Sequence, residues 1–211
     1  MAKGILVAAF DFSTAHEDEF HDWYDLEHVP ERQRVPGFGQ SERWISVQNP
    51  KHAVASYELD SPDVLHSPAY LAIGGDNLSV WSKRVTAMCN RLVRYEGEQC
   101  PLPGNQAAPA GASALLLNFI GIDPEHESEF NDWYDQEHIP SLSTVPGTLC
   151  ARRYRDAQGS RRYLAIYHLA NTDVPATDAW KRAAHTPWTE RMRPRFRNHL
   201  RILTHRYRRT A

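Results

Sequence analysis

The sequence repeats itself at a fixed spacing. Residues 16–30 (HEDEFHDWYDLEHVP) match residues 126–140 (HESEFNDWYDQEHIP) at a shift of 110 positions, and eleven of the fifteen residues are identical. The match continues in the same register through two Val-Pro-Gly segments, at 35–37 and 145–147. A chain of 211 residues is long enough for two units with separate cores. The repeat therefore predicts two copies of one domain-sized fold.

A segment rich in Pro, Gly and Ala separates the two copies. Residues 97–112 interrupt both the helical and the strand patterns, as linkers do. We expect a first unit at residues 1–96, a linker at 97–112 and a second unit at 113–211.

Each copy shows the order strand, helix, strand, strand, helix, strand. Strands are expected at 4–10, 38–48, 52–60 and 87–95 and again at 113–121, 148–156, 161–169 and 199–207; helices are expected at 14–29, 63–85, 124–139 and 174–193. This order predicts a ferredoxin-like α+β unit, a four-stranded antiparallel sheet with two helices on one face. Packing the two sheets face to face would bury the surface that each leaves bare.

Composition excludes several classes of function. The formal net charge is −2 and the pI is near 6.6, which argues against a nucleic-acid partner. The arginine-rich residues 191–209 are expected to be balanced by the acidic residues 11–31. No run of 18 apolar residues occurs, so no membrane span is expected. Three cysteines without C-x-x-C spacing suit a reducing, cytoplasmic location.

The first helix of each copy carries the candidate chemistry. Positions four apart share one side of a helix, so Tyr24 and His28 are expected side by side on an inward stripe. Asp25 lies three residues before His28, and we expect it to orient the imidazole and to favour its charged form. Pro30 is expected to end the helix nearby. Tyr134, Asp135 and His138 repeat the arrangement in the second copy. The alternative for both histidines is a helix-capping role under the Val-Pro-Gly turn.

Other residues are candidates for substrate contacts. The tryptophans before the tyrosines, the arginines of the following strand and the tyrosines of the third strand form this group: Trp23, Trp133, Arg43, Arg153, Tyr57 and Tyr167. Each has a structural alternative: packing for the tryptophans, a pair with a helix acid for the arginines, and a core position for the tyrosines.

A metal site is not expected. His16 and His28 lie twelve residues apart, which is roughly 18 Å along a helix, so they cannot share an ion. No H-E-x-x-H motif occurs.

The motif D-W-Y-D-x-E-H-x-P resembles the Y-W-x-x-x-H-x-P signature of the EthD-like members of the dimeric α+β barrel superfamily. It departs from that signature in having Trp-Tyr for Tyr-Trp and in fusing two units. The resemblance implies an intramolecular dimeric α+β barrel, with the helix histidine of the family at His28 and His138. Relatives it implies are muconolactone isomerases, polyketide cyclases and decarboxylases, and cofactor-free monooxygenases that act on small aromatic or lactone compounds; more distant members bind haem.

The leading hypothesis is a cofactor-independent lyase or isomerase that acts on an aromatic, lactone or polyketide-like compound. His28 and His138 would move a proton, Asp25 and Asp135 would orient them, and Tyr24 and Tyr134 would hydrogen-bond a substrate oxygen. The alternatives are a non-catalytic module that binds a small hydrophobic molecule and a haem-dependent enzyme. Both a monomer with an internal pseudo-dimer and a homodimer are compatible with the sequence.

Overall fold

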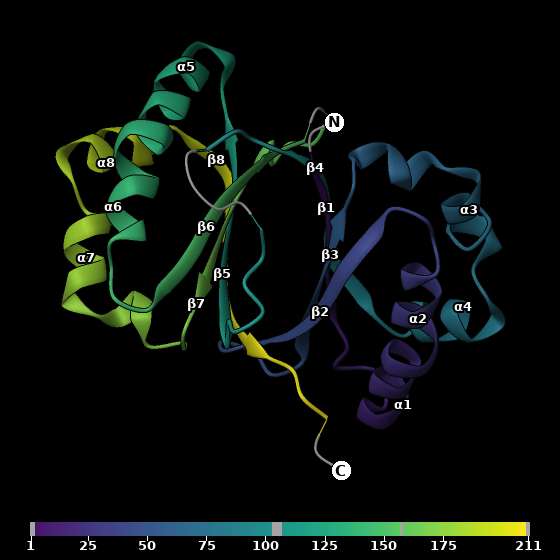
Figure 1. Ribbon diagram of the computed structural model, residues 1–211. Coiled ribbons are helices and arrows are strands. Elements are labelled where there is room, and N and C mark those ends of the chain that lie inside the picture. The colour runs from purple at the N-terminus through teal and green to yellow at the C-terminus, as the bar shows by residue number, and fades with distance from the viewer. Residues whose placement is uncertain (1–2, 103–106, 157, 210–211) are drawn as a thin grey trace. The chain divides into compact units, whose positions relative to one another are not determined.

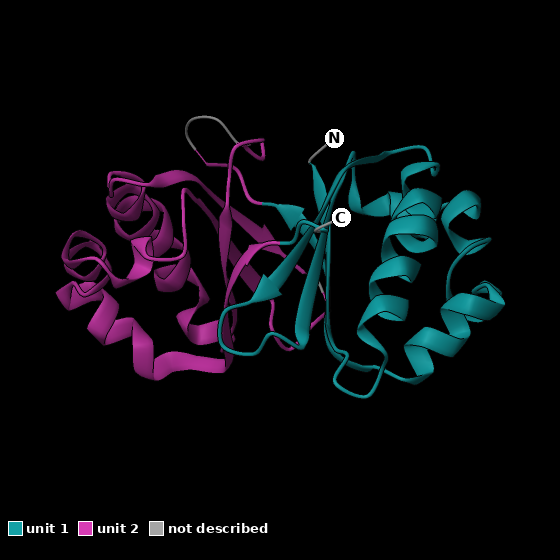
Figure 2. Ribbon diagram, turned by 90° about the horizontal axis from the view of Figure 1, so that it is seen from below, with its two compact units in different colours: residues 1–99, 207–211 teal, residues 100–206 magenta. Residues whose placement is uncertain are grey.

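The computed structural model describes residues 3–102, 107–156 and 158–209. The chain divides into two units, residues 1–99 with 207–211 and residues 100–206 (Figure 2). The segment from Tyr207 belongs to the first unit, whereas the sequence had assigned it to the second, because the Tyr207 ring stacks on His21 with 4.4 Å between centroids. Within the expected linker, residues 97–99 continue a strand, and residues 103–106 lie outside the described residues.

The first unit is a four-stranded antiparallel sheet with helices on one face (Figure 1). Its elements are β1 (Gly4–Asp11), α1 (Glu17–Asp22), a π-helical turn (Trp23–His28), α2 (Val29–Gln33), β2 (Phe38–Ser46), β3 (His52–Leu59), a 3-10 turn (Pro62–His66), α3 (Pro68–Leu71), a second 3-10 turn (Gly75–Asn77), α4 (Val80–Ala87) and β4 (Asn90–Gln99). The strand order is β4-β1-β3-β2.

The second unit repeats this plan in the same order. Its elements are β5 (Ala114–Ile122), α5 (Pro124–Trp133), a π-helical turn (Tyr134–His138), α6 (Ile139–Ser143), β6 (Thr148–Arg155), β7 (Tyr163–Leu169), a 3-10 turn (Val174–Ala176), α7 (Asp178–Ala184), α8 (Pro187–Met192), a 3-10 turn (Arg193–Arg195) and β8 (Phe196–Arg206). The strand order is β8-β5-β7-β6. The predicted ferredoxin-like α+β fold is thus confirmed for both units.

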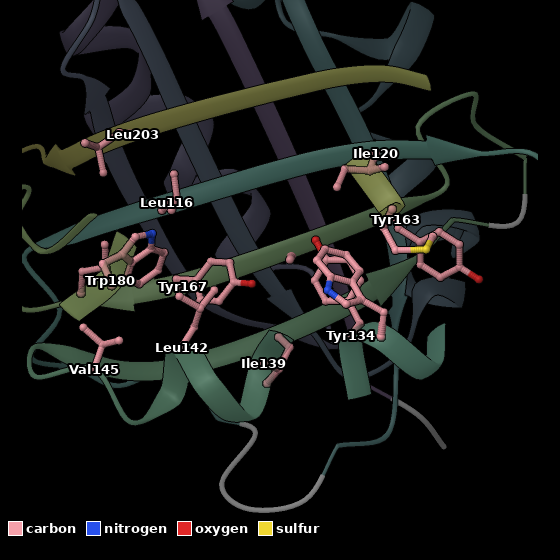
Figure 3. Close-up of a cluster of buried hydrophobic side chains, with 14 of the residues drawn as sticks. Leu116, Ile120, Tyr134, Ile139, Leu142, Val145, Tyr163, Tyr167, Trp180 and Leu203 are labelled. Atoms are coloured by element: carbon pink, nitrogen blue, oxygen red, sulfur yellow. The ribbon is translucent and has the colours of Figure 1, made fainter. Parts of the chain in front are cut away.

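The core of each unit lies between its sheet and its helices. Strand side chains alternate between faces, so Leu116 and Ile120 of β5 point toward the helices of the second unit. There they join a buried cluster that includes Leu142 from α6, Tyr167 from β7 and Trp180 from α7 (Figure 3). The first unit has an equivalent cluster.

The first helix of each unit does not end at its proline as expected. In the first unit it passes Pro30 and continues to Gln33, and in the second it continues to Ser143. A proline inside a helix lacks an N–H, and its ring crowds the carbonyl of the preceding turn. The π-helical turn that precedes each proline is wider than an α-helical turn, and this relieves the crowding.

The second helical segment of each unit is broken where a continuous helix was expected. Between residues 62 and 87 the chain forms four short pieces, and Pro68 and two adjacent glycines, Gly74 and Gly75, stand at the breaks. In the second unit the break precedes Pro187. These short pieces do not cover the sheet as a single continuous helix would, and a space remains between them and the sheet.

The Val-Pro-Gly turns fix where the second strand of each unit begins. Gly37 has φ +93° and Gly147 has φ +90°, a left-handed conformation that favours glycine. A Cβ at Gly37 would lie 2.5 Å from Cγ2 of Val64, so the turn also excludes a side chain by contact. Among the described residues no helix has the length and apolar character of a membrane span.

Candidate functional site

A cavity lies in each unit between the first helix, the sheet and the broken helical segment. The cavity of the first unit has a volume of about 550 Å³ and is lined by residues that include His28, Arg32, Tyr57, Tyr70, Arg94 and Glu96. The cavity of the second unit has a volume of about 360 Å³, and its lining includes Asn118, Trp133, Tyr134, His138, Trp180 and Arg201. Both volumes are in the range of small-molecule sites.

His28 and His138 line these cavities, as the sequence predicted. The His28 ring lies against Trp23, with 4.3 Å between ring centroids, and edge-on to Tyr24 at 5.2 Å. Residues five apart share a face in a π-helical turn, which brings His28 closer to Trp23 than to Tyr24. His138 lies 4.3 Å from the Trp133 ring in the same way.

Each imidazole lines a cavity and has one ring nitrogen that is fully buried. Nδ1 of His28 and of His138 is buried without a hydrogen-bond partner among the described residues. Both rings keep part of their surface at the cavity wall. The nitrogen that a guest molecule would meet is therefore Nε2.

Both imidazoles are neutral at neutral pH, so the expectation of a favoured charged form is wrong. Burial, reinforced by the guanidinium groups of Arg32, Arg43 and Arg94, holds the pKa of His28 well below 6.5. Burial together with Arg193 and Arg153 lowers the pKa of His138 to about 3. Desolvation disfavours the imidazolium, and nearby cations act in the same direction.

The acids expected to orient the histidines bind arginines instead. Asp25 Oδ1 accepts a hydrogen bond from Arg43 Nη1 at 2.5 Å, and Asp135 Oδ1 accepts one from Arg153 Nη1 at 2.5 Å. The expected Asp–His contact is thus wrong in both units. One cause is geometric, because the π-helical turn rotates His28 relative to Asp25. The other is electrostatic, because the arginine on the next strand carries a full positive charge whereas the imidazole is neutral.

Arg43 and Arg153 belong to the scaffold and do not line either cavity. Each guanidinium packs over the tyrosine of its helix, at 4.5 Å from the Tyr24 centroid and 4.4 Å from the Tyr134 centroid. The substrate-clamp interpretation is wrong, and the alternative that paired these arginines with helix acids is confirmed.

Replacement of Asp25 by Asn is expected to affect stability and to leave the chemistry of His28 unchanged. The buried Arg43 would lose its carboxylate, which should lower the free energy of unfolding by about 1 kcal/mol, a value reduced because Asp25 is partly exposed. Urea unfolding measures this loss. If the substitution instead shifted the titration of His28, followed by NMR, an Asp25–His28 interaction would exist in solution.

Two buried tyrosines stand beside the histidine in each unit. The hydroxyls of Tyr24 and Tyr57 in the first unit, and that of Tyr167 in the second, are buried without a hydrogen-bond partner among the described residues. Burial raises the pKa of all four phenols, so they remain protonated. Tyr57 lines the first cavity and Tyr134 the second, whereas the other member of each pair lies behind the wall.

The tryptophans tie the first helix to the last helix of each unit. Trp23 Nε1 donates to Ser82 Oγ at 2.9 Å, and Trp133 Nε1 donates to Thr189 Oγ1 at 3.1 Å. Trp133 also lines its cavity, while Trp23 does not.

Several cavity residues were missed by the sequence reasoning. They are the polar residues on the outer and central strands and on the broken helical segment, namely Tyr70, Arg94, Asn118, Arg193 and Arg201. The alternation of the last strand could have identified Arg201, because it shares its side of β8 with the buried Leu203. It could not have identified Arg94, because Leu92 and Glu96 on its side of β4 are only partly buried. Tyr70 and Arg193 could not have been found in this way, since the breaks in the helical segment place them.

The histidines were also assessed as ligands for a metal or for haem. The described residues contain no cluster of three or more His, Cys, Asp or Glu that could hold a metal ion. A histidine that ligates haem iron normally donates its second ring N–H to a carboxylate, a carbonyl or water. Nδ1 has no such partner in either unit, and Asp25 is engaged by Arg43. The described residues therefore supply no protein acceptor that would orient either ring as a haem ligand.

No protein-family model matches the sequence, and no curated protein matches it. Solved structures match nearly the whole chain. An anthrone oxidase-like protein has a TM-score of 0.67 at 10% identity, covering 99% of this chain and 92% of its own. At this identity the likeness shows a shared α+β fold.

Two further solved structures are similar to the chain. A candidate monooxygenase from Fusobacterium nucleatum subsp. nucleatum has a TM-score of 0.60 at 10% identity, covering 98% of this chain and 93% of its own. A variant of chlorite dismutase from Candidatus Nitrospira defluvii, in complex with cyanide, has a TM-score of 0.64 at 12% identity, covering 98% and 91%. At such identities the comparisons show a shared fold alone, and the activity has to be argued from the site.

Proposed function

We propose that this chain is a small-molecule enzyme that moves a proton on an aromatic or lactone-like carbonyl compound, without a cofactor, in a cavity lined by His28 or His138. One observation supports this most directly. In both units a neutral imidazole lines a cavity of small-molecule size, and a protonated phenol lines the same cavity. The EthD-like motif leads to the same histidine.

The neutral state of the imidazole defines its role. A ring with a depressed pKa is available as a proton acceptor throughout the neutral range, but it is a weak base. It gains strength when an anion forms beside it, because an adjacent negative charge favours the imidazolium. Abstraction of a proton next to a carbonyl would produce such an anion in the cavity.

Arginines in the cavity walls supply the complementary charge. Arg201 in the second unit lines the same cavity as His138. In the first unit Arg94 lines the cavity of His28 but is paired with Glu96, so Arg32 is the wall guanidinium that would fill this role there. Before substrate binds, burial and nearby guanidinium groups keep the pKa of the imidazole low, so the ring is neutral. During the reaction, a guanidinium in the wall would stabilise the enolate or phenolate that forms. Return of the proton at another carbon completes an isomerisation, and loss of a leaving group completes a lyase reaction.

A second candidate is an oxygenase that follows the same first step. It is favoured by the structural similarity to an anthrone oxidase-like protein and to a candidate monooxygenase. In that case the substrate carbanion would react with O₂ in place of being reprotonated. The two candidates share the histidine and differ in whether oxygen is consumed.

Solvent exchange provides the test of proton abstraction. The full chain would be incubated in deuterium oxide with a panel of hydroxylated aromatic ketones and lactones, and exchange of the acidic C–H would be followed by NMR. We expect catalysed exchange for at least one compound, with an oxygen electrode distinguishing the oxygenase. A cavity that binds these compounds without accelerating exchange or oxygen uptake would indicate a non-catalytic binding module.

A further inference from the structure

The two cavities differ in one charged group at the same place in the fold. Arg94 of β4 pairs across the sheet with Ala8 of β1, and Arg201 of β8 pairs with Asn118 of β5. Ala8 and Asn118 are related by the 110-residue repeat, so the two arginines occupy equivalent positions.

In the first unit this arginine is neutralised by its neighbours. Arg94 Nη2 contacts Glu96 Oε1 at 2.5 Å and donates to the hydroxyl of Tyr70 at 3.1 Å. Although burial acts in the opposite direction, these two partners raise the pKa of Arg94. The guanidinium is thus already supplied with an anion and an acceptor.

In the second unit both partners are replaced by apolar residues. Leu203 takes the place of Glu96, since Glu96 pairs with Leu6 and Leu203 pairs with Leu116 in the equivalent register. Trp180 takes the place of Tyr70: Trp180 N–H bonds the capping residue Thr177, as Tyr70 N–H bonds Ser67. Figure 3 shows Leu116, Leu203 and Trp180 at one end of the apolar cluster.

Arg201 consequently has no ion pair or hydrogen bond to any described residue. Its side chain is exposed at the cavity wall, and partial burial of the guanidinium lowers its pKa. The side chain of Asn118, its cross-strand neighbour, likewise makes no hydrogen bond within the described part of the chain. Both side chains line the cavity of the second unit. Two adjacent groups that can donate hydrogen bonds therefore face the cavity without an internal acceptor.

The rest of the cavity wall suits an aromatic anion. Trp133, Tyr134 and Phe196 provide flat apolar surface. Lys181 and Arg193 also line the cavity, but each forms an ion pair, with Asp178 and with Glu190. No described Asp or Glu is among the lining residues, whereas Asp76 and Glu96 line the cavity of the first unit. A planar carboxylate matches the fork of a guanidinium better than a neutral group does.

We infer that the cavity of the second unit is a binding site for an aromatic carboxylate, held by Arg201 and Asn118, and that the cavity of the first unit lacks this preference. The two units would then bind different molecules despite their common helix motif. This inference rests on the proposed function only in treating the bound carboxylate as a substrate; the binding preference itself is independent of turnover.

Calorimetric titration of the full chain with 2-naphthoate, benzoate and the neutral isostere 2-naphthamide tests the site. We expect one carboxylate site per chain, with 2-naphthoate bound at least tenfold more tightly than 2-naphthamide. Arg201→Gln should weaken 2-naphthoate binding by about 10- to 100-fold and abolish the preference over the amide, because a charged hydrogen bond is lost. The matched variant Arg94→Gln should retain both, and the thermal unfolding midpoint of each variant verifies its fold.

A second variant tests the origin of the difference between the units. Glu96→Gln removes the carboxylate that occupies Arg94, and we expect it to create a second 2-naphthoate site in the first unit. Three results would overturn the inference: no measurable binding of either carboxylate, an unchanged preference in Arg201→Gln, or a single site in Glu96→Gln. Failure of the proposed function would be seen in a different measurement: turnover would survive replacement of His28 and His138, whatever result the calorimetric titrations give.

Discussion

Replacement of both cavity histidines, His28→Gln together with His138→Gln, is expected to reduce turnover by roughly 100- to 10,000-fold, the usual contribution of a proton-transferring side chain. The glutamine amide keeps much of the volume and polarity of the ring but cannot accept a proton. Because each unit has its own cavity, the single variants report which unit works. If both are active, each single replacement should remove the activity of one cavity and leave that of the other.

The control for this experiment is His16→Gln. His16 is the N-cap residue of α1 and belongs to the repeated motif, but it is exposed and does not line the cavity. Its replacement should leave turnover unchanged. A double variant at His28 and His138 that retained more than a tenth of the wild-type rate would remove proton transfer by these residues from consideration.

The features that follow from local patterning could be predicted from the sequence. The repeat, the strand alternation and the Val-Pro-Gly turns fix the order of elements in each unit, and most strand ends differ from expectation by only a few residues. The failures occurred where the backbone departs from regular geometry. Pro30 was expected to end the first helix, but a π-helical turn accommodates this proline. The spacing of apolar residues in the sequence does not reveal such a turn.

The site was predictable to the extent that it depends on one helix. His28 and His138 were placed at the cavities by the motif, but their charge state was not. The sign of the pKa shift depends on burial and on arginines from distant strands, and the helix alone shows only the nearby Asp25. The sequence offered two partners for Asp25, His28 on the same helix and Arg43 as the partner of a helix acid, and only the contact between elements decides that it binds Arg43.

The buried neutral histidines should make the protein unusually sensitive to acid. In the unfolded chain a histidine takes up a proton near pH 6.5, whereas the folded state lowers the pKa of His138 to about 3 and that of His28 well below 6.5. Between these values the unfolded state binds more protons, so the free energy of unfolding is fully present above pH 6.5 and falls as the pH decreases toward 3. The expected slope is about 1.4 kcal/mol per pH unit for each histidine.

This slope can be isolated by comparing His138→Gln with the wild type in urea unfolding experiments at pH 7, 6 and 5. Carboxylates that titrate in the same range contribute equally to both proteins and cancel. The stability of the variant relative to the wild type should therefore increase by about 2 kcal/mol between pH 7 and pH 5. Tyr134→Phe is the matched control, because burial raises the pKa of this neighbouring phenol and it gains no proton in acid. Parallel stability curves for His138→Gln and the wild type would mean that the imidazole reaches solvent and titrates normally, and the cavity position of its ring would then have to be abandoned.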